Sequence, residues 1–174
     1  EQKKWQQVIP LVERMDSLSS QSNSLAFCMS VERLAGIEVP ERVQWIRTLI
    51  AELQRINSHL VWLGTHALDI GAMSVFLYCF REREHILDMF EMISGQRMMT
   101  SYIRPGGVWR DITPDFLPAL RNFLDYFPRR IDEYEALLTD NPLWRDRTQG
   151  IGFLSAEDAI RLGCTGPTLR GSGV

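Results

Sequence analysis

The stretch that decides the fold is Pro40 to Gly71, which reads PERVQWIRTLIAELQRINSHLVWLGTHALDIG. Apolar residues recur in it every three or four positions, with Glu, Arg and Gln on the other side, and this spacing is typical of an amphipathic α-helix. The apolar positions are Val43, Ile46, Ile50, Leu53, Ile56, Leu60 and Leu63. Proline is favoured at the start of a helix and glycine at its end. We therefore expect one long helix that begins at Pro40 and ends or bends at Gly71.

Other helices are expected on both sides of this stretch. They cover about residues 11–34, 75–94, 114–139 and 156–162. Gly36 and Gly95 follow the first two and are expected to end them. Between the second and the third, Arg104-Pro-Gly-Gly predicts a turn or a short hairpin. An anion could also bind there, but a structural turn is the better interpretation.

The later helices carry their own start and break signals. Thr113 is expected to cap the helix that Pro114 opens. Pro128 lies inside that helix and predicts a kink or break near Tyr126. Ser155 and the acid three residues later resemble a capping box for the last helix.

These patterns predict the all-α class: a bundle of long helices with an irregular, loop-rich C-terminal arm. We expect a single helical domain over residues 1–174, with a helical core at 1–141 and the arm at 142–174. We also expect this domain to be the central piece of a longer protein.

Composition agrees with a globular domain. The 174 residues include 19 Lys and Arg against 22 Asp and Glu, a net charge of −3, and 45% of residues are hydrophobic. These values exclude a disordered tail, a collagen-like repeat and a coiled-coil rod, and no clustered basic face suggests nucleic-acid binding. Cys28, Cys79 and Cys164 are far apart, so we expect reduced, buried thiols.

The segment from Leu60 to Phe80 is apolar enough to suggest a membrane span. Its one acid is Asp69, and an acid at the centre of a span costs roughly 2.5–3.5 kcal/mol on insertion scales. We favour two helix ends that are joined at Gly71 and covered by the rest of the bundle, by further chain or by a partner.

Asp69 is the main candidate for chemistry, because a carboxylate between Leu68 and Ile70 is costly to bury without a partner. A buried carboxylate takes up a proton more readily, so Asp69 is a candidate for proton exchange. A metal site is not expected. His59 and His66 are about 10 Å apart along a helix, and Glu82-x-x-His85 has no second copy.

Two other patterns exclude enzyme classes. The serine-rich run from Ser17 to Ser24 has no Gly-x-Ser-x-Gly around it, so a hydrolase is not indicated. The glycines near the C-terminus form no GxGxxG after a strand, so no dinucleotide site is indicated. Serines in a helix can instead line a polar cavity or allow close helix packing.

Several motifs in order give the chain a resemblance to a known family. They are His59 to Met73, Phe80 to Glu84, Gly95 to Arg97, Tyr102 to Gly107, Arg130 to Glu135 and Leu169 to Val174. The chain resembles the D-type subunits of NADH–quinone oxidoreductase, the nickel–iron-hydrogenase-like large subunits in the peripheral arm of respiratory complex I. Hydrogenases carry a Cys-x-x-Cys pair where this sequence has Asp16 to Ser19, so the resemblance favours the quinone-reducing branch.

The resemblance implies a wall of a quinone cavity, where electrons arrive from the terminal iron–sulfur cluster of a partner subunit. It implies that Asp69 is the catalytic, proton-linked carboxylate and that Thr65, Asp69 and Ser17 contact quinone. It also implies that Arg14 and Met99 lie near the cluster. Quinone would be the substrate, and this piece alone would bind no cofactor tightly.

Two departures from the family pattern leave an alternative open. Ser17 stands where the family usually has a quinone-binding tyrosine, and Met99 stands where many members have a histidine that titrates with the cluster. The chain is therefore either a variant quinone-reducing subunit or a catalytically silent, hydrogenase-related scaffold that holds partner redox subunits.

The resemblance also implies partners and a location. The partners are the iron–sulfur small subunit, a neighbouring peripheral-arm subunit and the quinone-channel membrane subunit, with no nucleic acid. The location is the cytoplasmic face of the bacterial cell membrane, where the protein is peripheral and does not span the bilayer.

Overall fold

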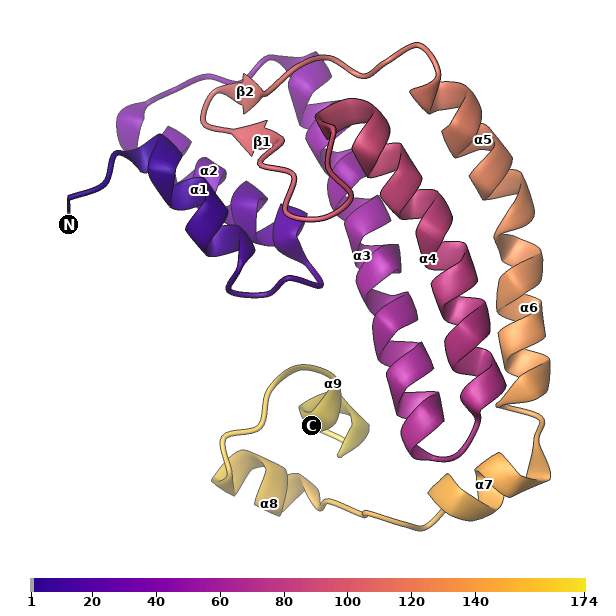
Figure 1. Ribbon diagram of the computed structural model, residues 1–174. Helices are drawn as coiled ribbons and strands as arrows, with labels where there is room; N and C mark the ends of the chain where they lie inside the picture. The colour runs from indigo at the N-terminus through magenta and orange to yellow at the C-terminus, as the bar shows by residue number, and fades with distance from the viewer. Residues whose placement is uncertain (1) are drawn as a thin grey trace. The chain divides into compact units, whose positions relative to one another are not determined.

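The computed structural model describes residues 2–174 and confirms the all-α class (Figure 1). The elements are α1 (Trp5–Glu13), α2 (Ser20–Ala35), α3 (Glu41–Asp69), α4 (Met73–Ser94), β1 (Ile103–Arg104), β2 (Gly107–Val108), α5 (Phe116–Tyr126), α6 (Pro128–Leu137), α7 (Pro142–Thr148), α8 (Ala156–Arg161) and α9 (Gly166–Gly171). They form two compact units, one ending at Tyr134 and the other beginning at Glu135.

The first unit is built on α3 and α4, which run side by side in opposite directions (Figure 1). Gly71, at φ 101°, makes the sharp turn between them. The two helices approach closely at Gly64, where an added Cβ would lie 3.3 Å from both Cys79 Cβ and Phe76 Cα. Helices α5 and α6 follow the other side of α4, so α4 lies in the middle of the unit (Figure 1).

The predicted turn at Arg104 is confirmed as a two-stranded antiparallel hairpin, with Ile103 opposite Val108. Pro105 and Gly106 connect the strands, and the φ of 83° at Gly106 suits a type II turn, whose third residue needs a positive φ. The hairpin packs against α2 and α3.

The prediction of one helix over residues 11–34 was wrong, because the chain forms α1 and α2 with a turn between them. Asp16 makes this turn: the Leu18 N–H donates to its side chain at 3.0 Å and the Ser19 N–H to its carbonyl at 3.1 Å. Short polar side chains offer the backbone such alternatives to helix. Gly36, at φ 65°, ends α2 as predicted.

The other helix limits agree with the sequence to within a few residues. The long helix α3 begins one residue after Pro40. Helix α5 begins later than predicted, with Asp115 in place of Thr113 at its N-cap, and the predicted break falls at Phe127. Helices α7 and α9 were not predicted. No helix in residues 2–174 is long and apolar enough to cross a membrane.

In the second unit, the Ser155 hydroxyl accepts a hydrogen bond from the Asp158 N–H at 3.0 Å, so the predicted cap of α8 is confirmed. The prediction of three buried thiols was right for two of them. Burial raises the pKa of Cys28 to about 12 and that of Cys79 to about 11. Cys164 is only half-buried.

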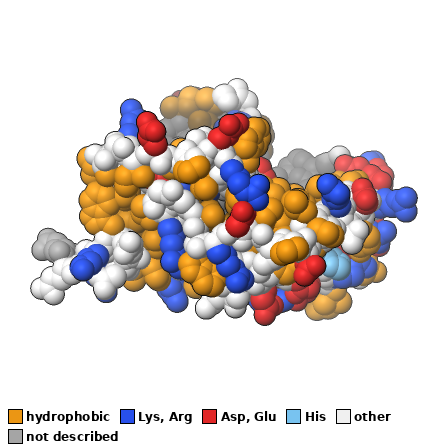
Figure 2. All heavy atoms as spheres, turned by 90° about the horizontal axis from the view of Figure 1, so that it is seen from above, with side chains coloured by type: hydrophobic (Ala, Val, Ile, Leu, Met, Phe, Trp, Pro, Cys, Tyr) orange, Lys and Arg blue, Asp and Glu red, His pale blue; other side chains and the backbone are white. Residues whose placement is uncertain are grey.

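Apolar side chains also reach the surface. On the face shown in Figure 2, hydrophobic side chains lie between charged ones. In the first unit, Trp62, Met73 and Leu77 are each at least 60% exposed and lie around the turn between α3 and α4.

Candidate functional site

Arg14 and Ser17 lie in the turn between α1 and α2. Arg14 is exposed and donates from Nη1 to the Pro10 carbonyl at 2.7 Å, while Ser17 is half-buried. The turn is held on the middle of α3, because Gln54 Nε2 donates to the Leu18 carbonyl at 2.7 Å. The residues with predicted roles near a cluster and a quinone therefore start from a fixed place on α3.

Met99 belongs to a loop, Met99–Ser101, that the structure brings to the same place. Its link to the turn is Glu13, which accepts hydrogen bonds from the Ser101 N–H at 2.8 Å and the Ser101 hydroxyl at 3.0 Å. Met99 and Ser101 have φ values of 47° and 46°, which cost roughly 1–3 kcal/mol each in residues other than glycine. Arg14, Ser17 and Met99 thus belong to one region, which we name the turn end of the site.

Buried polar side chains fill the space behind the turn end. Gln21 donates to the Thr100 hydroxyl, and the Ser20 hydroxyl donates to Gln54 Oε1 at 3.4 Å. Ser24 is also fully buried. These contacts explain part of the serine-rich run, whose serines face a polar interior rather than a catalytic base.

Thr65 and Asp69 lie elsewhere, in the last turns of α3. Both side chains are exposed, and the Thr65 hydroxyl donates to the Val61 and Trp62 carbonyls at 2.9 and 3.1 Å. The expectation that Asp69 is buried in apolar surroundings was wrong for this chain. Asp69 is the last residue of its helix, and the elements of the first unit do not cover it.

The two groups of predicted residues share one face of α3. At roughly 100° per residue, Thr65 lies about 20° and Asp69 about 60° around the helix from Gln54, which holds the turn. At about 1.5 Å per residue, they lie about 16 Å and 22 Å further along the axis. Burial decreases along this face, from Gln54 at 2% exposure through half-buried Ser58 to the two exposed residues.

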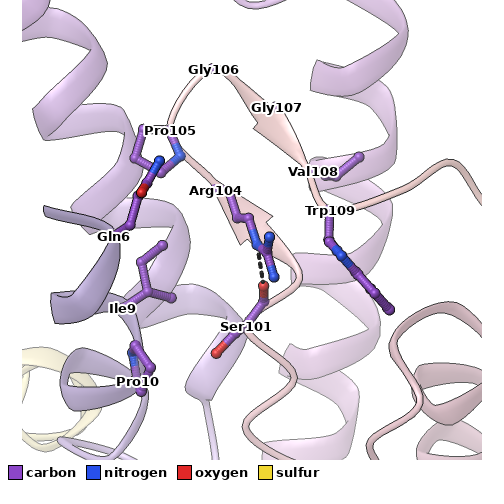
Figure 3. Close-up of a pocket in the computed structure, with 10 residues that line it drawn as sticks. All are labelled: Gln6, Ile9, Pro10, Ser101, Arg104, Pro105, Gly106, Gly107, Val108 and Trp109. Carbon is purple, nitrogen blue, oxygen red and sulfur yellow. Dashed lines mark hydrogen bonds between the residues drawn. The ribbon is translucent and has the colours of Figure 1, made fainter.

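A hollow of about 620 Å³ lies beside the turn end, between α1 and the hairpin (Figure 3). Ile9 and Pro10 form one wall, and the hairpin forms the other with Trp109 at its end. Arg104 donates from Nε to the Ser101 carbonyl at 3.1 Å, so this hollow shares Ser101 with the Glu13 link.

The charged stretch at Arg81–His85 is not the solvated face that its composition suggested. Glu82 is fully buried and pairs with Arg81 at 2.5 Å and with the Tyr126 hydroxyl at 3.1 Å. Burial also lowers the pKa of Arg83, whereas Glu84 is exposed and pairs with Arg97. Within residues 2–174 no three His, Cys, Asp or Glu side chains gather as a metal site would require.

Comparison with known proteins identifies the family. The family described as "Respiratory-chain NADH dehydrogenase, 49 Kd subunit" matches residues 69–174. The chain belongs to this family. Members of the 49 Kd family with high similarity include the NADH-quinone oxidoreductase D-subunit 1 of Solibacter usitatus, 58% identical, and the D-subunit 2 of Roseiflexus sp., 60% identical. Both alignments cover all 174 residues of this chain and 42% of the relative, so the chain spans about two fifths of these 49 Kd family members.

Sequence reasoning missed Glu13 as a site residue. It precedes Arg14 directly, yet nothing in the local pattern distinguishes it from an ordinary surface acid of a helix. Its importance arises from Ser101, which lies 88 residues later. The only signal in the sequence was indirect: an acid on the otherwise apolar side of a short helix, next to a polar turn.

Proposed function

We propose that the chain forms part of the quinone-reducing site of an NADH–quinone oxidoreductase and acts in electron transfer from an iron–sulfur cluster to quinone. The observation that carries this proposal is the shared face of α3. It joins the turn end, with Arg14 and Ser17, to Thr65 and Asp69 at the end of the same helix. Family membership supports the same reaction class.

The geometry divides the work between the two ends. A quinone headgroup is a single ring, so it cannot contact groups that are about 16–22 Å apart along α3. We place the headgroup at the turn end, where the Ser17 hydroxyl can donate a hydrogen bond and Arg14 supplies positive charge. The cluster would supply electrons from a partner subunit on the side of Arg14 and Met99, since the cysteines within residues 2–174 form no ligand set.

Asp69 serves in this proposal as the proton donor and acceptor at the open end of the path. Reduction of a quinone to a quinol consumes two electrons and two protons, and an exposed carboxylate exchanges protons readily with solvent. The hydroxyls of Thr65 and Ser58 lie between Asp69 and the turn on the same face of α3, so with intervening water they can relay protons toward the headgroup.

The proposal includes the surroundings of the chain. We infer an iron–sulfur small subunit at the turn end, a neighbouring peripheral-arm subunit, and a quinone-channel membrane subunit over the exposed ends of α3 and α4. Trp62, Met73 and Leu77 give these ends an apolar surface suited to a permanent partner. The complex would lie peripherally at the cytoplasmic face of a bacterial cell membrane.

The test is Asp69→Asn in the complete complex, with Asp125→Asn on α5 as a control that removes the same charge. We expect quinone reduction to fall at least tenfold in Asp69→Asn, while electron transfer from NADH to ferricyanide stays unchanged in both variants. Thr65→Val, which keeps the side-chain shape without the hydroxyl, should lower quinone reduction severalfold. Undiminished quinone reduction in Asp69→Asn would remove this residue from the mechanism.

Ser17 and Met99 keep a second function in consideration, that of a silent scaffold for partner redox subunits. The scaffold predicts that the complete complex takes up no quinone and reduces none. Protection of the turn end from cross-linking by added quinone would instead support the quinone site.

A further inference from the structure

We infer that Glu13 is a positioning residue, which holds the loop Met99–Ser101 against the turn that carries Arg14 and Ser17. This inference rests on the proposed function, since it assigns to Glu13 the geometry of the turn end. Glu13 ends α1 and is fully buried. Its carboxylate accepts three hydrogen bonds, from the Ser24 hydroxyl at 3.1 Å, the Ser101 N–H at 2.8 Å and the Ser101 hydroxyl at 3.0 Å.

All three donors to Glu13 are neutral. Within residues 2–174 this carboxylate forms no ion pair, and the neighbouring Arg14 side chain is directed to the Pro10 carbonyl instead. Buried carboxylates are normally paired with a cation, because a charge loses its hydration on burial. By contrast, the other buried carboxylates in the first unit, Glu32 and Glu82, each have an arginine.

The hydrogen bonds of Glu13 act on a strained part of the chain. Ser101 has a φ of 46°, a conformation that residues other than glycine rarely adopt, and Met99 is similar at 47°. Such a conformation persists only where its surroundings hold it. The carboxylate binds both the N–H and the hydroxyl of Ser101, so it fixes the position and the orientation of this residue together.

The consequence concerns Arg14 and Met99, which lie one residue from Glu13 and two residues from Ser101. Without the carboxylate, the loop can relax toward ordinary backbone conformations and move away from α1. The gap between Arg14, Ser17 and Met99 would change, although none of these three side chains had been altered. The expected effect is weaker quinone binding rather than loss of the redox chain.

The experiment compares Glu13→Ala with Glu13→Gln in the complete complex. Glutamine can keep all three contacts, since its carbonyl accepts from Ser24 and the Ser101 N–H while its amide donates to the Ser101 hydroxyl. We expect Glu13→Ala to raise the KM for a short-chain quinone at least fivefold, with kcat and ferricyanide reduction within twofold of wild type. Glu13→Gln should restore the KM to within twofold.

Three results would overturn the inference: an unchanged KM in Glu13→Ala, a loss confined to the amount of assembled complex, or a Glu13→Gln variant as impaired as Glu13→Ala. If Glu13→Ala does not assemble, Ser101→Ala decides, since it removes one of the three hydrogen bonds. A KM at least twofold higher supports positioning, and an unchanged KM contradicts it.

Parallel measurement of Asp69→Asn separates this inference from the proposed function. A normal Asp69→Asn with an impaired Glu13→Ala would remove the proton path along α3 and leave the positioning role intact. An impaired Asp69→Asn with a normal Glu13→Ala would do the reverse. A complete complex that reduces no quinone would contradict both.

Discussion

Glu32 and Arg47 form an ion pair inside the first unit, and the hairpin depends on it. Arg47 donates to the two carboxylate oxygens of Glu32 at 3.0 and 2.6 Å, and the Gly106 N–H donates to Glu32 at 2.7 Å. Arg47 also donates to the Arg104 and Gly107 carbonyls at 2.7 and 2.9 Å. Both strands of the hairpin are therefore tied to α2 and α3 through one pair of charges.

This pair gives the free energy of unfolding a pH dependence. Burial alone would raise the pKa of Glu32, but the hydrogen bonds from Arg47 and Gly106 outweigh it and hold the pKa below its ordinary value of 4.5. A carboxyl whose pKa is lower in the folded state stabilises the fold fully above its unfolded pKa, and this contribution is lost as the pH falls through the folded pKa. We expect the chain to lose stability below about pH 4.5.

Glu32→Gln checks this expectation by urea unfolding at pH 7 and at pH 3.5. At pH 7 the variant should be less stable by about 3–5 kcal/mol, because Arg47 remains buried without its partner. Its stability should depend less on pH than that of the wild type. Glu52→Gln, which removes an exposed partner of Arg55, is the control. Equal pH dependence in wild type and Glu32→Gln would contradict the assignment.

At the scale of elements, the contact of α3 with α4 is limited by the side chain that Gly64 lacks. We expect Gly64→Ala to destabilise the chain by about 1–3 kcal/mol through overpacking. This cost should exceed the gain of up to about 1 kcal/mol that alanine brings to a helix, because the added methyl meets the Phe76 backbone, which cannot move alone. The midpoint of thermal unfolding measures the effect.

The matched control is Gly107→Ala in β2, where an added Cβ meets nothing within 4 Å. It should leave the midpoint nearly unchanged. A Gly64→Ala variant as stable as Gly107→Ala would show that α3 and α4 can separate by a few tenths of an ångström at little cost.

The sequence predicted those elements whose signal is local. Helix α3 has a continuous apolar stripe, and Gly36, Gly71 and Gly95 mark helix ends in the only residue type that adopts their φ values easily. The turn at Asp16 was missed because its hydrogen bonds interrupt a pattern that otherwise reads as helix. Helices α7 and α9 were missed because each is only six or seven residues long.

The candidate site was harder to predict than the fold, for a physical reason. Thr65 and Asp69 share a helix, so their spacing follows from the sequence, but their exposure depends on what covers the helix. The contact between Glu13 and Ser101 spans 88 residues, and no periodicity in one segment indicates a partner so far away.

At the scale of the whole molecule, the exposed apolar side chains predict association. Trp62, Met73 and Leu77 around one turn, and Phe153 in the second unit at 89% exposure, are unusual for a chain that works alone. We expect the isolated chain to self-associate at micromolar concentration, as light scattering would show. Met73→Lys with Leu77→Lys should reduce this association, and a clean monomer of the wild type would contradict the expectation.

The uninterrupted length of α3 has a consequence for how the protein can vary. The helix works as a ruler, because its 29 residues set both the distance and the rotation between the polar turn and the acid at its tip. Loss or gain of one codon between Gln54 and Thr65 would turn the tip by roughly 100° while moving it by only about 1.5 Å. We expect homologous genes to tolerate length changes in the loops far more readily than in this segment.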